Sequence, residues 1–127
     1  MKFKMQIFII IVLVFILNCD MGLSSGEDLV GEWRVVSDIY GVILYGGGSL
    51  TYNADYTGYL THEEISYFKW KIRKGENYNI LQRINNLTNI VAHEEEYFFS
   101  SDKQYLYKRD YEPDKIIKQT WVKYKRQ

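Results

Sequence analysis

Two short stretches combine histidine with carboxylates, the side chains that hold metal ions and move protons. Residues 62–64 read His-Glu-Glu and residues 93–96 read His-Glu-Glu-Glu. Two imidazoles with carboxylates would bind Zn²⁺ if the chain brought them together. Neighbouring residues of a strand point to opposite faces, so neither group converges by itself. We interpret both as solvated strand ends and predict no metal site and no cofactor.

The short motifs that organise many catalytic sites are also missing from the chain. The sequence contains no nucleophile elbow, no phosphate-binding glycine loop and no H-E-x-x-H pair. We therefore predict a protein that is not an enzyme.

The single cysteine, Cys19, is the next residue with chemistry of its own. One cysteine cannot form an intramolecular disulfide. It follows Lys2, Lys4 and an apolar run over Ile7–Leu17, which is about half of the roughly 20 residues that a membrane span needs. The segment Ile16–Cys19 resembles a bacterial lipobox, although Asn18 stands where a smaller residue is usual. The alternative is an ordinary cleaved signal followed by an incidental cysteine.

These features divide the chain into three parts. The resemblance implies a lipoprotein signal peptide over 1–18 and acyl chains on Cys19, which would hold the protein at a membrane. Residues 19–28 are small and polar, and we expect them to form a flexible tether. Residues 29–127 form one folded domain. The expected location is the bacterial cell envelope, lipid-anchored and facing the periplasm or the surface.

The composition of the folded part favours strands. Aromatic residues make up 17% of the chain, including 12 Tyr, and there is a single Pro. Alternation of apolar and polar residues between Gly, Asn and Asp turns gives eight strand candidates and no helix after the signal helix. They lie at Leu29–Ile39, Ser49–Ala54, Thr57–Glu63, Ile65–Lys74, Tyr78–Ile84, Asn89–Phe99, Gln104–Arg109 and Ile116–Tyr124.

Short connections between these strands predict an all-β, antiparallel up-and-down meander. Eight strands can close into a barrel and so remove both sheet edges. A two-sheet sandwich is the alternative. We predict that the apolar faces of two central strands line the interior, with the candidate ligand-lining residues Phe68, Trp70, Ile72, Tyr78 and Ile80. The same side chains would equally fill a small barrel without leaving a cavity.

Gly31-Glu32-Trp33, followed by an alternating strand, resembles the G-x-W opening of the lipocalin (calycin) superfamily. The turn around Asn53-Ala54-Asp55 strengthens the resemblance to short bacterial lipocalin-like domains. The resemblance implies that Trp33 closes one end of the barrel beneath an arginine, with Arg126 as first choice and Arg109 as second. It also implies a small apolar or amphipathic ligand.

The charge balance limits the classes of partner to be expected. The 16 basic and 16 acidic residues cancel, and loss of Lys2 and Lys4 with the signal leaves a slight acidic excess. This balance gives no reason to expect nucleic acid as a partner. Two functions remain open: a membrane-tethered barrel that binds a small apolar or amphipathic ligand, and a cell-envelope protein-interaction or inhibitor module with a packed core. An interior cavity larger than about 300 Å³ would favour the first.

Overall fold

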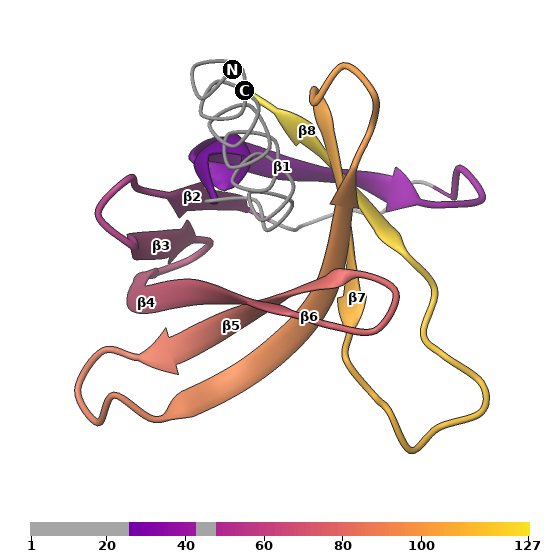
Figure 1. The fold of residues 1–127 in the computed structure, drawn as a ribbon. Helices are drawn as coiled ribbons and strands as arrows, with labels where there is room; N and C mark the ends of the chain where they lie inside the picture. Colours follow the sequence, from indigo (N-terminus) through magenta and orange to yellow (C-terminus); the bar gives the residue numbers. More distant parts are fainter. Residues whose placement is uncertain (1–25, 43–47) are drawn as a thin grey trace, which may run out of the picture.

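The chain forms a closed antiparallel β-barrel of eight strands, which the computed structural model describes over residues 26–42 and 48–127 (Figure 1). Each strand pairs with the next, and the last pairs with the first, so the sheet has no free edge. The strands are β1 (Gly31–Asp38), β2 (Ser49–Tyr52), β3 (Thr57–Thr61), β4 (Ile65–Lys74), β5 (Asn79–Asn85), β6 (Val91–Phe99), β7 (Tyr105–Asp110) and β8 (Val122–Arg126). The predicted all-β barrel is confirmed, and the sandwich alternative is excluded.

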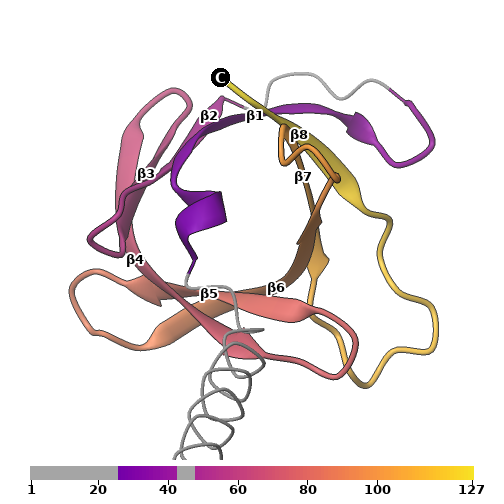
Figure 2. The same cartoon turned by 45° about the horizontal axis from the view of Figure 1, so that its top comes forward.

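The connections alternate between the two ends of this barrel. The turns β2–β3, β4–β5 and β6–β7 lie at one end, which the 3₁₀ turn η1 (Glu27–Leu29) closes from inside (Figure 2). We call this the closed end. The connections β1–β2, β3–β4, β5–β6 and β7–β8 lie at the other, open end. The predicted signal peptide and Cys19 lie outside the described residues.

The described fold begins before the predicted domain start at residue 29. Gly26 and η1 belong to the barrel, because η1 lies in the lumen and buries Leu29 completely. The last three residues of the predicted tether, 26–28, are therefore part of the folded unit.

The last strand differs most from its prediction. The strand expected at 116–124 begins at Val122, and residues 111–121 form an irregular connection. Pro113 has no backbone N–H for a ladder, and a local turn closes between the Glu112 carbonyl and the Lys115 N–H. Ile116 and Ile117 therefore point to solvent, with 99% and 87% of their surface exposed.

Candidate binding site at the open end

The closed end is sealed by a contact between the first and last strands. The guanidinium of Arg126 on β8 lies 4.2 Å from the ring centroid of fully buried Trp33 on β1. Its Nη1 and Nη2 donate to the carbonyls of Val30 (2.8 Å) and Asp28 (2.7 Å). The Trp33 indole Nε1 donates to the carbonyl of Leu29 at 2.8 Å. One arginine thus holds η1, β1 and β8 together, whereas Arg109 lies on the outer wall.

Gly31 leaves space for the guanidinium of Arg126 beside the backbone. Its φ is +136°, a region that residues with a side chain rarely adopt. A Cβ at this position would lie 2.9 Å from Arg126 Nη1. The glycine of the Gly31-Glu32-Trp33 triplet therefore allows the arginine to approach the backbone.

Large side chains fill the lumen above this seal. Trp33, Tyr52, Phe68, Trp70 and Tyr97 belong to one buried cluster. Tyr52 makes edge-to-face contacts with Phe68 and Trp70, at centroid distances of 5.8 and 5.6 Å. These contacts place aromatic rings from β2 and β4 together inside the barrel.

A buried charged pair on the neighbouring strands β6 and β7 lies in the lumen where this cluster ends. Lys108 on β7 is 2% exposed, and its Nζ lies 3.1 Å from Oε1 of Glu95 on β6 and 3.3 Å from the Tyr52 hydroxyl on β2. Burial favours the neutral amine, but the attraction of Glu95 outweighs it and leaves the Lys108 pKa well above its ordinary value. Burial likewise opposes ionisation of Glu95, but Lys108 and Arg83 more than compensate and lower its pKa. Both residues are therefore charged.

Further toward the open end the lumen is lined by ionisable side chains, which we call the mouth cluster: Arg83, His93, Glu95 and Asp110. His93 Nε2 lies 2.9 Å from Asp110 Oδ1 and 4.0 Å from Glu95 Oε1. Arg83 Nη2 lies 3.8 Å from Glu95 Oε1 and its guanidinium lies over the Phe68 ring. A hollow of about 380 Å³ at the ends of β6 and β7 reaches His93 and Asp110 from outside.

Apolar side chains project from the connections that surround this mouth. Three connections of the open end carry strongly exposed apolar residues: Tyr40 and Val42 after β1, Leu87 and Ile90 after β5, and Ile116 and Ile117 after β7. Leu87 is 90% exposed and Tyr40 82%. Figure 1 shows the β5–β6 and β7–β8 connections at the bottom, opposite the C terminus. We call these six residues the apolar rim. These connections of the open end therefore expose apolar side chains, and the β7–β8 connection also extends along the outer wall, where Pro113 and Lys118 line a hollow with Glu76 and Asn77 of the β4–β5 turn.

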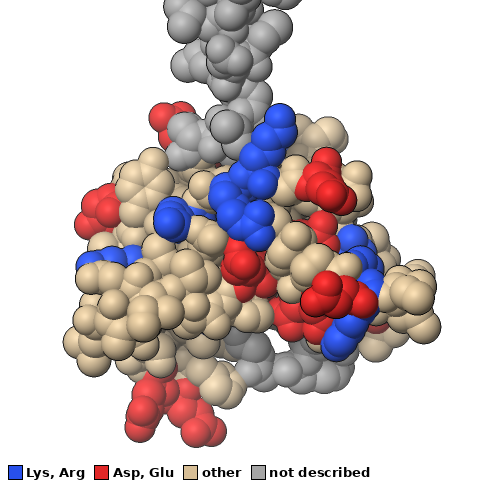
Figure 3. Space-filling view, turned by 60° about the horizontal axis from the view of Figure 1, so that its bottom comes forward, with Lys and Arg blue, Asp and Glu red and all other residues tan. Residues whose placement is uncertain are grey.

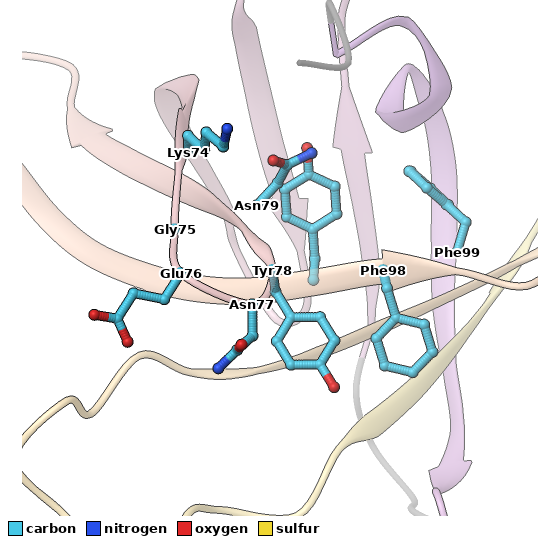
Figure 4. A pocket seen from close by; sticks show the side chains of 9 residues that line it. Lys74, Gly75, Glu76, Asn77, Tyr78, Asn79, Phe98 and Phe99 are labelled. Atoms are coloured by element: carbon cyan, nitrogen blue, oxygen red, sulfur yellow. The ribbon is translucent and has the colours of Figure 1, made fainter. Parts of the chain in front are cut away.

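A second aromatic group covers the outer wall of the barrel. Trp121 packs against Tyr78 and Phe98, with centroid distances of 4.8 Å to each, and Arg109 lies 4.2 Å from the Trp121 ring. Figure 4 shows Tyr78 and Phe98 on one side of the sheet and Asn79 on the other, beside a hollow of about 330 Å³.

This outer group corrects two of the predicted lumen residues. Ile72 pairs with Leu81 on the inner face, so Ile80, which pairs with Arg73 and Glu96, must point outward. Tyr78 likewise packs on the outer wall, against Trp121. Strand β5 is buried on both faces, because its inner face packs into the lumen and the β7–β8 connection covers its outer face. Apolar residues therefore stand on both faces of β5, and the prediction assigned the outer ones to the lumen. Phe68 and Trp70 lie in the core cluster, and Ile72 packs against it.

The two histidine groups separate in the fold. His62 lies in the exposed β3–β4 connection. His93 and Glu95 share the inner face of β6 because they are two residues apart, and Asp110 is the cross-strand partner of Glu95. The prediction rested on adjacent residues, which point to opposite faces, whereas His93 and Glu95 are two apart and Asp110 carries no local signal.

The described surface does not carry one dominant charge on the face that Figure 3 shows, because acidic and basic groups alternate with uncharged ones. Among the described residues, no helix is long and apolar enough to cross a membrane.

Comparison of the chain with family models, curated proteins and solved structures finds no match.

Proposed function

We propose that the protein is a non-enzymatic, lipocalin-like barrel, tethered by lipidated Cys19 at a bacterial cell-envelope membrane, whose open end binds another envelope protein. The observation that carries this proposal is the pair of exposed apolar side chains on each of three open-end connections, together with an interior that large side chains fill. Monomeric proteins rarely expose apolar side chains on several neighbouring loops unless the loops meet a partner. The filled lumen argues against a deep cavity for a fatty ligand.

The tether supports this orientation. The described chain enters the barrel at the closed end, beside Arg126. Residues 20–25 span at most about 20 Å even when fully extended. A membrane anchor at Cys19 would therefore hold the closed end near the bilayer and present the open end away from it.

A small amphipathic ligand is the second candidate, and the rim hollow favours it. The hollow is lined by Val91 and Ala92 as well as His93, Glu94 and Asp110. A ligand with a polar head at His93 and a short apolar part against Val91 and Ala92 would suit this lining.

Native mass spectrometry of the full chain extracted from the envelope in mild detergent tests both candidates. We expect a stoichiometric complex with a second protein in the wild type, and loss of that complex in an Ile116→Ser, Ile117→Ser double variant. Tyr67→Ser removes an exposed ring on the outer wall and serves as the matched control. An adduct below about 1 kDa in place of a protein would favour the ligand candidate. A complex that survives the rim variant would overturn the proposal.

A further inference from the structure

The mouth cluster contains three potential metal ligands from two neighbouring strands. His93 and Glu95 lie on β6 and Asp110 on β7, and one donor atom of each lies within 4.8 Å of the other two. All three are partly or largely buried, and the hollow of about 380 Å³ gives an ion access to His93 and Asp110 from solvent. The barrel wall fixes their backbone positions, because Glu95 and Asp110 are direct cross-strand partners.

The spacing of the donor atoms fits a small transition-metal ion. An ion about 2.0–2.2 Å from each of three tetrahedral ligands places the donor atoms about 3.3–3.5 Å apart. The observed separations from His93 Nε2 are 2.9 Å to Asp110 and 4.0 Å to Glu95. The donor atoms of Glu95 and Asp110 lie within 4.8 Å of each other, so side-chain shifts of about an ångström would complete a three-ligand site with one position left for water.

We propose that His93, Glu95 and Asp110 bind a divalent transition-metal ion, with Zn²⁺ as the best match to one imidazole and two carboxylates. This site goes beyond the proposed function and does not depend on it. Binding requires His93 to present the lone pair of Nε2, which faces both carboxylates.

The basic neighbours of Glu95 set the strength of this site. Lys108 hydrogen-bonds Oε1 of Glu95, and Arg83 lies 3.8 Å from the same oxygen. Such contacts orient a ligating carboxylate, as outer-shell donors do in metal sites, but their positive charge opposes a second cation. On the rim side, Glu94 and Glu112 also face the hollow and offset part of this charge. We therefore expect a moderate affinity for Zn²⁺. We expect the selectivity among divalent cations to depend on the His93 imidazole.

Calorimetric titration with ZnCl₂ of the untagged full chain, held in detergent, tests the site. We expect one Zn²⁺ per chain in the wild type and binding weakened at least about tenfold in His93→Ala and in Asp110→Asn. His62→Ala removes the other histidine, which lies in the exposed β3–β4 connection, and should leave binding unchanged. Glu95 is not replaced, because its loss would leave Lys108 buried without a charged partner.

A second readout distinguishes loss of the ligand from loss of the fold. Near-ultraviolet circular dichroism reports the aromatic core of each variant, and His93→Gln replaces His93→Ala if the alanine variant loses that signal. Co²⁺ in place of Zn²⁺ should give visible absorption bands of a four-coordinate site. Absence of Zn²⁺ binding in the wild type, equal weakening by His62→Ala, or Ca²⁺ binding that does not need His93 would each overturn the proposal.

Discussion

At the scale of single residues, the Lys108–Glu95 pair is the costliest feature of the lumen. Both side chains leave water, and their attraction must offset the loss of hydration. Tyr52 adds a hydrogen bond from across the barrel, and burial raises the pKa of its phenol despite the nearby ammonium of Lys108. The pair therefore favours one arrangement of β2, β6 and β7 over others.

Removing one member of this pair should cost more than removing both. Lys108→Met leaves Glu95 buried with only the more distant Arg83 and His93 nearby, and we expect a loss of about 3–5 kcal/mol in the free energy of unfolding. The Lys108→Met, Glu95→Leu double variant should recover most of this loss, because it removes both desolvation penalties. Urea unfolding of the four proteins of the cycle measures the coupling, and a double variant less stable than Lys108→Met alone would contradict it.

The same pair predicts the pH range of stability. Since the folded-state pKa of Glu95 lies below its ordinary value of 4.5, the contribution of Glu95 is complete above about pH 4.5 and is lost as the pH falls through the lower, folded-state pKa. Since the folded-state pKa of Lys108 lies above 10.5, its contribution is complete below about pH 10.5 and is lost at higher pH. The stability difference between the wild type and the double variant should therefore be flat from about pH 5 to pH 10. A steady slope across that range, measured by urea unfolding, would argue against the assignment.

At the scale of elements, the closed end depends on how β1 and β8 meet around η1. Arg126 donates to the carbonyls of Asp28, Val30 and Lys103 and lies over the Trp33 ring. This geometry needs a planar guanidinium, which lysine cannot replace. The seal is therefore a property of the two strands and η1 together, although one side chain makes it.

Arg126→Ala should loosen this end. Loss of three charged hydrogen bonds and a cation–π contact predicts destabilisation of about 2–4 kcal/mol. Arg126→Lys should recover only a small part. Arg34→Ala on β1 is the matched control, because the Arg34 side chain is 61% exposed and should change stability by less than about 0.5 kcal/mol. Thermal unfolding with tryptophan fluorescence provides the measurement, and equal effects of Arg126→Ala and Arg34→Ala would refute the role of the seal.

The same elements show what the sequence could predict. Turn residues and alternation located the first seven strands, because Gly, Asn and Asp interrupt apolar patterns, whereas β8 begins at Val122 and not at the predicted Ile116. The facing of β5 could not be predicted, because Trp121, more than 35 residues later, buries its outer side. The mouth cluster was missed for a related reason: His93, Glu95 and Asp110 converge only through the register of β6 with β7.

At the scale of the whole molecule, the barrel is polarised. One end combines the entry of the chain, η1 and the Arg126 contact, while the other combines the mouth cluster with the apolar rim. In the proposed arrangement the closed end faces the anchoring membrane and the open end faces a partner. This polarity links the tether to the binding surface, so both should be tested in one chain.

The proposed lipid anchor at Cys19 can be tested directly. If Cys19 becomes the acylated N-terminus, the mature protein should begin at Cys19, carry the mass of its acyl chains and fractionate with membranes. Cys19→Ser should appear in the soluble envelope fraction or retain residues 1–18, with the same barrel stability, because the described fold begins at Gly26. Intact-protein mass spectrometry and membrane fractionation measure both effects. A mature N-terminus at another residue, or an unmodified Cys19, would disprove the anchor while leaving the Zn²⁺ and rim experiments valid.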